Sequence, residues 1–535
     1  MSVAGGAAPA DPGEIQRVLD ARASEIPGTG IVAAVIDDRK VTFYTAGESG
    51  TQRPLDEWTL FEIGSVTKTF TATVLAEMVL AGHVQLSDPV QKYLPSSVHV
   101  PTYEGREITL LDLATQHSGL PRLPTNLPAG DLNPYANYTP DLLYAFLNSY
   151  KLTRAPGATF EYSNLGVGLL GFALARANNA TYEAMVRSRV WNPLHMNGSA
   201  IALDAQERAR FVAGHDVDGR VVPSWDFGEP VVGAGGIRSD IADMAKYLDA
   251  AMGHGPLAKT MLFAQEPRST FLGHHIGLVW RINDASGFID HGGDTAGYHA
   301  EVVMTGDRKH GVVLLSNGPL VADLASHILD TTYPVTPAQA SLKLSAAQLD
   351  EYVGMYTNDA DKLTYVITRV GTQLQAKIVG QPSAPIYASR PDHFYYKSVI
   401  AYIEFVRQGG NVVGLILTQS GNHIPVYRLG ADGKPLVDKL APGYPPVVTP
   451  DSATLQSHVG TYHSGNLAFA ITVVNGRTFA KLGDQAAYEV YPSANDAFFY
   501  KIVDAQITFQ RDPSGKVTGL ALVQNGRAIT YTKDP

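Results

Sequence analysis

The sequence has no cysteine, no excess of basic residues and no long hydrophobic run. The lack of cysteine among 535 residues excludes disulfide bonds, thiol nucleophiles and metal sites built on thiolates. A formal net charge of −10 argues against a nucleic acid or an anionic membrane surface as the main partner. Gly, Ser or charged residues interrupt every apolar run before it reaches a membrane-spanning length, so we expect no transmembrane segment.

The remaining composition is that of a soluble globular protein, with 45% hydrophobic and 17% charged residues. The length predicts two or three domains, because a single core rarely grows beyond about 250–300 residues. Residues 1–12 lack the basic start and apolar stretch of a signal peptide. We therefore expect a cytoplasmic location, or a periplasmic or secreted one if a signal peptide has been removed.

The segment 61–70 places a serine and a lysine three residues apart at the start of a predicted helix that stops at Gly82. Side chains three apart on a helix are neighbours, so the Ser65 hydroxyl and the Lys68 amine point the same way. A desolvated amine loses its proton near neutral pH and can take one from a serine. The alternative is an N-cap serine followed by a solvated lysine, because Ser-x-x-Lys is common by chance.

The pattern up to about residue 330 predicts an antiparallel sheet with helices packed on it. The predicted helices are 14–23, 65–81, 108–116, 140–150, 165–174, 181–191, 237–248 and 320–329. The predicted strands are 30–37, 40–45, 276–282, 298–304 and 311–315.

Two further motifs carry side chains that could take part in catalysis or substrate binding. Tyr162 and Asn164 lie on the link into an apolar helix, where a phenol and an amide can face the same side. The alternative is a turn tyrosine with an Asx-type cap. The motif His291-Gly-Gly lies between two predicted strands, and its missing Cβ atoms let another backbone or a substrate approach. A structural histidine at a strand end is the alternative there.

The three motifs, in this order, resemble those of the serine β-lactamase-related family, peptidase family S12. This family includes class C β-lactamases, D-alanyl-D-alanine carboxypeptidases and D-aminopeptidases. The resemblance covers residues 13–332 and implies an α+β catalytic domain of the β-lactamase and penicillin-binding-protein type. In that fold an antiparallel sheet with helices lies beside an all-helical lobe. We assign this domain to residues 1–335.

The resemblance implies the roles of the first two motifs. Ser65 is the expected nucleophile, and Lys68 and Tyr162 are the expected groups that move its proton. A tyrosine close to a lysine has its anionic form favoured, which suits a base. Asn164 is expected to hold the substrate amide. The mechanism requires no cofactor and no metal.

The resemblance implies that the third motif lines the substrate-binding site and the oxyanion hole. His291 stands where a lysine usually heads this motif, and Gly292 and Gly293 follow it. The expected oxyanion donors are the backbone N–H groups of Ser65 and of Asp294.

Residues 346–535 contain an internal repeat whose offset stays between 104 and 106 residues. Each copy alternates short β-rich runs with turn residues, which predicts two small antiparallel, lipocalin-like β-barrels at 346–440 and 451–535. Proline-rich links at 331–337 and 441–450 bound the copies. A catalytic domain followed by two barrels resembles the three-domain architecture of bacterial D-aminopeptidases.

The expected function is that of a serine hydrolase that forms an acyl-enzyme on Ser65 and acts on peptides containing D-amino acids. His-x-Gly in place of Lys-Thr-Gly favours a D-aminopeptidase or a D-Ala-D-Ala carboxypeptidase. A class C-like β-lactamase and a carboxylesterase are the enzymatic alternatives. A non-catalytic β-lactam or peptidoglycan-binding protein is less favoured, since it has no need for Lys68 and Tyr162 together. The expected partner is a peptide or small-molecule substrate, and a homo-oligomer stays open.

Overall fold

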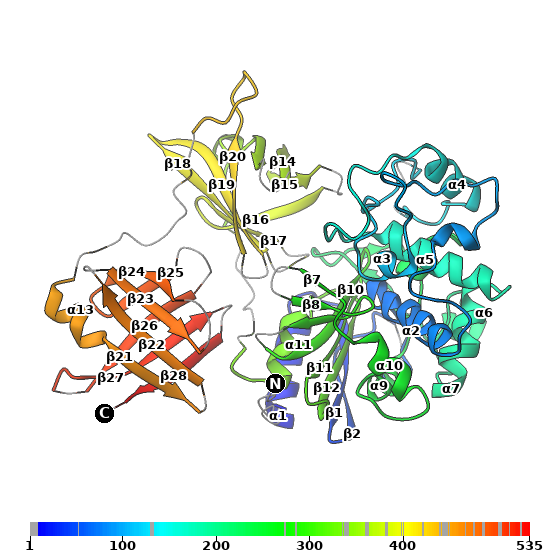
Figure 1. Ribbon diagram of the computed structural model, residues 1–535, viewed down its shortest axis with the longest axis horizontal. Coiled ribbons are helices and arrows are strands. Elements are labelled where there is room, and N and C mark those ends of the chain that lie inside the picture. The colour runs from blue at the N-terminus through cyan, green and yellow to red at the C-terminus, as the bar shows by residue number, and fades with distance from the viewer. Residues whose placement is uncertain are drawn as a thin grey trace. The chain divides into compact units, whose positions relative to one another are not determined.

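The computed structural model forms two compact units, Met1–Thr331 and Thr332–Pro535 (Figure 1). The predicted links at 331–337 and 441–450 fall partly or mostly outside the described residues. The structure describes residues 9–51, 53–128, 133–271, 274–283, 286–333, 335, 342–358, 363–379, 383–396, 399, 401–419, 422–437, 440, 448, 450–465, 467–474, 477–483, 487–500, 505–512, 514–524 and 527–534.

The first unit is built on an eight-stranded antiparallel sheet. Its strand order is β2 (Lys40–Gly47), β1 (Gly30–Asp37), β12 (His310–Ser316), β11 (His299–Thr305), β10 (Phe288–Asp294), β9 (Arg281–Asn283), β8 (His274–Ile276) and β7 (Ser269–Phe271). The helices α1 (Pro12–Ala23) and α11 (Ala322–Leu329) cover one face, and α9 (Ile241–Ala251) and α10 (Ala258–Ala264) cover the other (Figure 1). Every residue of β11 and β12 is buried, because both faces of the sheet are covered.

The remaining elements of this unit form a helical lobe and short pairings beside the sheet. The helices are α2 (Thr67–Leu80), α3 (Leu110–Ala114), α4 (Pro140–Ser149), α5 (Asn164–Ala177), α6 (Tyr182–Val186), α7 (Asn192–Leu194) and α8 (Ala205–Arg208). Single turns are η1 (Gly64–Val66), η2 (Val90–Tyr93), the π-helical η3 (Arg187–Trp191) and η4 (Val232–Ala234). The short strands β3 (Phe61–Glu62) and β6 (Arg238–Ser239) pair with each other, as do β4 (Gly214–His215) and β5 (Val221–Val222).

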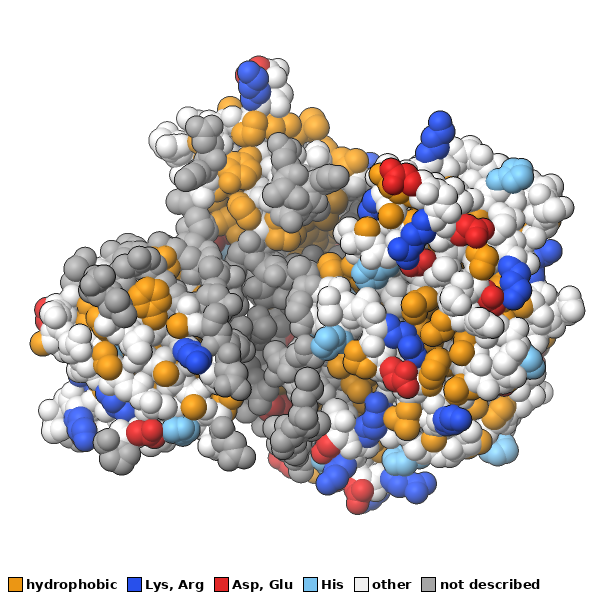
Figure 2. All heavy atoms as spheres, in the orientation of Figure 1, with side chains coloured by type: hydrophobic (Ala, Val, Ile, Leu, Met, Phe, Trp, Pro, Cys, Tyr) orange, Lys and Arg blue, Asp and Glu red, His pale blue; other side chains and the backbone are white. Residues whose placement is uncertain are grey.

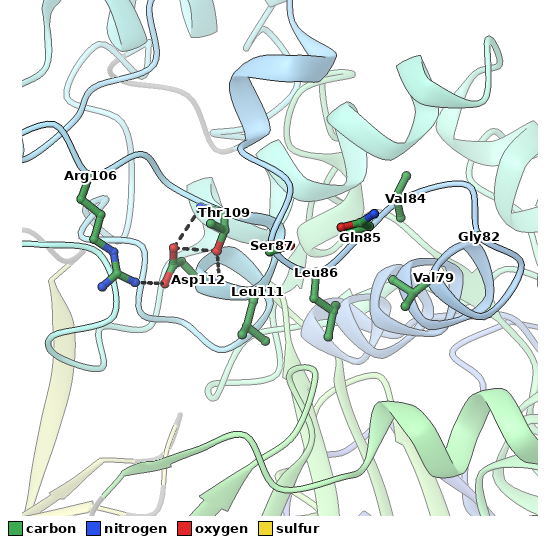
Figure 3. Close-up of a pocket in the computed structure, with 10 residues that line it drawn as sticks. All are labelled: Val79, Gly82, Val84, Gln85, Leu86, Ser87, Arg106, Thr109, Leu111 and Asp112. Carbon is green, nitrogen blue, oxygen red and sulfur yellow. Dashed lines mark hydrogen bonds and ion pairs between the residues drawn. The ribbon is translucent and has the colours of Figure 1, made fainter.

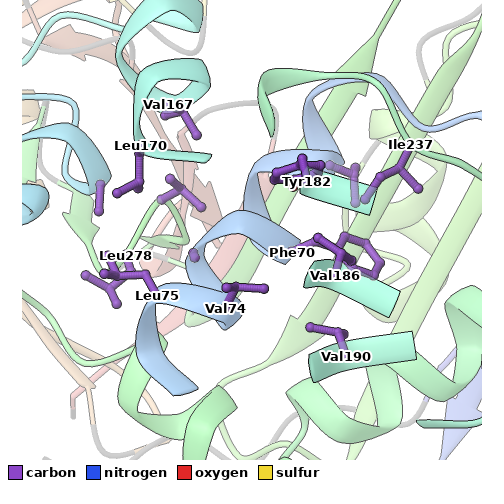
Figure 4. Close-up of a cluster of buried hydrophobic side chains, with 14 of the residues drawn as sticks. Phe70, Val74, Leu75, Val167, Leu170, Tyr182, Val186, Val190, Ile237 and Leu278 are labelled. Atoms are coloured by element: carbon purple, nitrogen blue, oxygen red, sulfur yellow. The ribbon is translucent and has the colours of Figure 1, made fainter. Parts of the chain in front are cut away.

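Helix α2 lies inside the core. Its side chains Phe70, Val74 and Leu75 lie among residues of α5 and of the segment 182–190 (Figure 4). Burial is not confined to one face of this helix, because every residue from Thr67 to Ala76 is buried. Burial of each large apolar side chain stabilises the fold by about 1.5–3 kcal/mol, which offsets the cost of burying a polar group on the same helix.

Several predicted boundaries differ from the structure. The predicted strand 276–282 is two short strands, because the chain turns between them and Val279 has a φ of 58°, outside the β region. The helix predicted at 237–248 begins at Ile241, where the Asp240 carboxylate accepts the Asp243 N–H at 2.9 Å. The His291-Gly-Gly motif lies within strand β10, paired with β11, rather than between strands.

The second unit contains two closed antiparallel barrels of eight strands each, as predicted. The first barrel follows α12 (Ala346–Asp350) and comprises β13 (Gly354–Asn358), β14 (Leu363–Val370), β15 (Gln373–Ile378), β16 (Ala384–Arg390), β17 (His393–Tyr396), β18 (Ala401–Gln408), β19 (Asn411–Gln419) and β20 (Asn422–Arg428). The second follows α13 (Ser452–His458) and comprises β21 (Gly460–Ser464), β22 (Leu467–Val474), β23 (Arg477–Leu482), β24 (Tyr488–Ala494), β25 (Ala497–Tyr500), β26 (Ala505–Arg511), β27 (Val517–Gln524) and β28 (Arg527–Lys533). The predicted limits 1–335, 346–440 and 451–535 stay predictions.

The two barrels share an interaction that ties the preceding helix region to the strands. In the first, Arg407 donates to Asp392 at 2.8 Å, beside the ring of Tyr352. In the second, Arg511 donates to Asp496 at 2.7 Å. His458 stands in the place of the tyrosine, with its Nε2 atom 2.8 Å from the same carboxylate. Both copies of the repeat therefore contain the Asp–Arg pair, whereas the aromatic residue beside it is a tyrosine in the first barrel and a histidine in the second.

The surface of the first unit carries charges of both signs. On the face shown in Figure 2, acidic and basic side chains are interspersed with apolar ones rather than gathered by sign. Among the described residues, no helix has the length and apolar character needed to cross a bilayer.

Candidate active site

Ser65 and Lys68 are neighbours at the junction of η1 and α2, as predicted. The Nζ atom of Lys68 lies 2.8 Å from the Ser65 hydroxyl oxygen. The same amine donates to the carbonyl of Ala234 at 2.7 Å, so the glycine-rich segment 233–236 fixes its position. Ser65 is half-buried, whereas the Lys68 side chain is fully buried.

Burial disfavours the charged form of the Lys68 amine. Burial, with a smaller contribution from the charge of Arg122, holds the pKa of Lys68 well below its ordinary value. In its neutral form, the amine that donates to Ala234 has a lone pair available for the Ser65 proton. The arrangement therefore provides a base in direct contact with the hydroxyl.

Tyr162 and Asn164 lie at the start of α5, and Tyr162 lies beside both Ser65 and Lys68. The phenol of Tyr162 is hydrogen-bonded to Ser65, and its ring centroid lies 5.0 Å from Lys68 Nζ. Burial raises the pKa of Tyr162, and the Ser65 hydrogen bond and the charge of Arg122 only partly oppose that rise. The expectation of an anionic Tyr162 is therefore wrong, and the group is a neutral phenol at neutral pH. The cap of α5 is Ser163.

Asn164 faces a wall of aromatic side chains. Its Nδ2 atom donates to the Tyr135 hydroxyl at 3.0 Å. Tyr135 stacks on Phe227 with centroids 4.7 Å apart and meets Trp225 edge to face at 5.4 Å. The Oδ1 atom of Asn164 is buried and has no hydrogen-bond partner among the described residues. An acceptor is therefore available to a substrate N–H group.

His291 lies on β10 as a neutral imidazole. Its Nδ1 atom is 2.7 Å from the Gly292 carbonyl oxygen, an acceptor, so Nδ1 carries the proton and Nε2 keeps its lone pair. Burial, and then the charges of Arg281 and Lys68, lower the pKa of His291 to about 3. His291 therefore supplies no positive charge to the site.

The backbones of β10 and η1 are in direct contact. A Cβ atom on Gly293 would lie 2.1 Å from the Ile63 carbonyl oxygen and 2.9 Å from the Ser65 nitrogen. A Cβ atom on Gly64, whose φ is +48°, would lie 2.7 Å from the Asp294 nitrogen. The predicted close approach of another backbone is confirmed, and it brings the amides of Ser65 and Asp294 together.

A charged cluster lies on β9, β10 and β11 beside the His291-Gly-Gly motif. Arg281 forms an ion pair with Asp290, and its guanidinium is 3.8 Å from Glu301. A Cβ atom on Gly292 would lie 2.6 Å from Glu301 Oε2, so this carboxyl occupies the space that the glycine leaves open. Burial raises the pKa of Glu301 above its usual range.

Four of these residues were not predicted from the sequence. None belongs to a motif, and each reaches the site through tertiary contacts: the loop residues Arg122 and Tyr135, and the strand residues Arg281 and Glu301. The one available signal was that Arg122 follows shortly after the predicted 108–116 helix, before the segment 125–140, which is rich in Pro, Asn and Gly.

A separate hollow lies at the C-terminal end of α2, away from Ser65 (Figure 3). Its charged side chains, Arg106 and Asp112, are paired with each other at 3.2 Å, and Asp112 also accepts from Thr109. The other lining residues shown are mainly apolar, and the hollow contains none of the motif residues.

The fold and the site geometry define a member of the serine β-lactamase and penicillin-binding-protein superfamily. Residues 16–328 match the Beta-lactamase family, and the chain belongs to it. Residues 444–532, which include all but the last residue of the second barrel, match a domain of unknown function, DUF3471.

Similar proteins carry several names. The D-alanyl-D-alanine-carboxypeptidase/endopeptidase AmpH of Escherichia coli K12 is 32% identical over 226 residues, 41% of this chain and 56% of AmpH. The matched part thus spans little more than half of AmpH. A Beta-lactamase of Yersinia enterocolitica is 26% identical over 330 residues, 54% of this chain and 82% of that protein. The crystal structure of the D-alanine carboxypeptidase AmpC from Burkholderia cenocepacia has a TM-score of 0.51 and 23% identity, covering 60% of this chain and 100% of that one.

Proposed function

We propose that the protein is a serine hydrolase that is acylated on Ser65 and that it cleaves peptides containing D-amino acids. The observation that carries this proposal is the buried Lys68 amine, which lies 2.8 Å from the Ser65 hydroxyl and whose pKa burial holds well below its ordinary value. Burial of a charged amine beside a hydroxyl costs free energy of folding unless the charge is lost, so a lysine with a purely structural role would not stabilise the fold at this position. A base of this kind typically contributes about 10²–10⁴-fold in rate.

In the proposed reaction the Ser65 oxygen attacks the substrate carbonyl carbon and passes its proton to the Lys68 nitrogen. The N–H groups of Ser65 and Asp294 then stabilise the negative charge on the carbonyl oxygen. The Tyr162 phenol, hydrogen-bonded to Ser65, donates a proton to the leaving nitrogen as its bond to carbon breaks. Tyr162 regains its proton from Lys68, and water later hydrolyses the acyl-serine by the reverse proton path.

The preference for D-peptides rests on two supports. AmpH, which shares 32% identity over its matched part, is named a D-alanyl-D-alanine-carboxypeptidase/endopeptidase. The imidazole of His291 is neutral, where the resemblance associates a lysine with class C β-lactamases. A D-aminopeptidase is the finer alternative within the same chemistry, and the two-barrel architecture favours it.

The test is intact-protein mass spectrometry after mixing with benzylpenicillin, sampled from seconds to hours, with Ser65→Ala as the control. A lasting adduct that Ser65→Ala lacks indicates slow deacylation and a penicillin-binding peptidase. Rapid loss of the drug without a lasting adduct indicates a β-lactamase. If neither occurs, D-peptide and ester panels separate an aminopeptidase from an esterase. Turnover of any of these compounds by Ser65→Ala would overturn the assignment of Ser65 as the nucleophile.

A further inference from the structure

The site contains four basic side chains, and three of them are buried or paired in ways that limit their positive charge. Burial holds the pKa of Lys68 well below its ordinary value and lowers that of His291 to about 3. Arg281 is charged but faces two acids, Asp290 in an ion pair and Glu301 at 3.8 Å. Arg122 differs, because no carboxylate within the described residues forms an ion pair with it. The site therefore has one uncompensated cation in the part of the chain that the structure describes.

Arg122 is held at the site by its backbone. Its carbonyl oxygen accepts the N–H of Asn164 at 3.0 Å and that of Leu165 at 3.3 Å, so it is anchored to the first turn of α5. Its guanidinium carbon lies 5.1 Å from the centroid of the Tyr162 ring, and the side chain is half-buried. Burial raises the pKa of Tyr135, and the positive charge of Arg122 partly opposes that rise. The guanidinium thus lies near both rings that flank Asn164.

The surroundings of Arg122 can receive the acyl part of a substrate. The buried Oδ1 of Asn164 has an open acceptor position, and Tyr135 with Phe227 and Trp225 provides an apolar wall. The Arg122 backbone is hydrogen-bonded to Asn164, and its guanidinium lies over the Tyr162 ring. A substrate amide that meets Asn164 therefore lies near Arg122.

We infer that Arg122 is a specificity-determining residue that binds a carboxylate on the acyl side of the substrate. This inference rests on the proposed acyl-enzyme function of Ser65. A guanidinium presents several N–H donors in a planar fork that matches the two oxygens of a carboxylate, and such charge-assisted bonds are about twice as strong as neutral ones. A half-buried site makes the pairing stronger than it is in bulk water.

The experiment compares two thioester substrates that differ in one group. Both carry a D-alanyl acyl unit and the same leaving group, and the N-terminal cap is succinyl in one and succinamoyl, its uncharged amide, in the other. We expect wild type to prefer the succinyl substrate by about tenfold or more in kcat/KM, and the preference to shrink with added salt. Arg122→Gln should reduce the ratio to within about twofold, and Arg122→Lys should keep part of it.

A matched control is Arg208→Gln, which removes an exposed arginine at the end of α8 and should keep the wild-type ratio. A ratio near one in wild type, or a wild-type ratio in Arg122→Gln, overturns the inference. An equal loss on both substrates with a displaced pH profile also overturns it, because Arg122 would then act only on Tyr162 and Lys68. If wild type forms an acyl adduct on Ser65 with both substrates equally, the inference alone fails. If it forms none and turns over neither, the proposed function fails with it.

Discussion

The contact between β10 and η1 makes two adjacent glycines respond very differently to the same substitution. In Gly293→Ala the new methyl group would lie 2.1 Å from the Ile63 carbonyl oxygen, so the strand or the turn must withdraw by about 1.3 Å to reach the ordinary contact distance of 3.4 Å. In Gly292→Ala the nearest atom, at 2.6 Å, is Glu301 Oε2, and the next is 3.5 Å away. A carboxylate at the end of a flexible chain can rotate, whereas two backbones cannot.

The expected loss follows from this displacement. A shift of about 1 Å at a reacting centre costs on the order of a hundredfold in rate, and loss of one oxyanion donor costs about as much or more. We therefore expect Gly293→Ala to slow acylation of Ser65 by at least about a hundredfold, and Gly292→Ala by less than about tenfold. Overpacking should also destabilise Gly293→Ala by about 1–3 kcal/mol.

The assay is the rate of adduct formation on Ser65, followed by mass spectrometry with the acyl donor to which wild type responds fastest. Thermal unfolding of both variants in parallel separates a misplaced site from an unfolded chain. The reasoning is refuted if a folded Gly293→Ala acylates within about tenfold of wild type. Equal losses in the two variants would refute it as well.

The remaining predictions concern charge. Lys68→Arg should lower kcat/KM by about 10²–10⁴-fold, because a guanidinium does not deprotonate and cannot act as the base. In wild type, the acylation rate should rise with pH only up to the lowered pKa of Lys68. If the rate instead fell below a pH of about 6.5 in wild type, and His291→Asn removed that fall, the roles assigned to both Lys68 and His291 would be contradicted. Burial lowers the pKa of His458, so the unfolded state binds the extra proton and the second barrel should lose stability as pH falls below about 6.5. His458→Tyr should remove this acid sensitivity, as seen by hydrogen exchange in β26 at pH 5 and 8, whereas Asp496→Ala should destabilise the barrel by about 1–3 kcal/mol at both pH values.

Local patterns in the sequence were enough for the elements that have a strong period or a repeat. The Ser65–Lys68 pair could be predicted because helical spacing alone makes the two neighbours. The barrels could be predicted because the same strand and turn sequence occurs twice. The glycines of the third motif implied a close backbone contact, since their missing Cβ atoms had no local purpose.

The parts that were missed depend on tertiary packing. The expectation that Tyr162 is anionic took its charged neighbours into account but not its burial, and burial has the largest effect on the pKa of Tyr162 in the folded chain. Strand β10 was not predicted because Asp290, His291 and two glycines give it neither the alternation nor the β-branched residues of a strand. Arg122 was missed because nothing in its own sequence shows that its guanidinium lacks a counter-ion.

The close packing of β10 on η1 also makes acylation a measure of the native state. The Ser65 and Asp294 amides come from distant parts of the chain and meet only when the sheet and the helical lobe have docked. Under the proposed chemistry, a molecule in which these parts have separated does not react, even if each retains its secondary structure. The fraction of chains that an acylating reagent labels therefore counts the correctly assembled molecules, and can do so in a crude extract without purification.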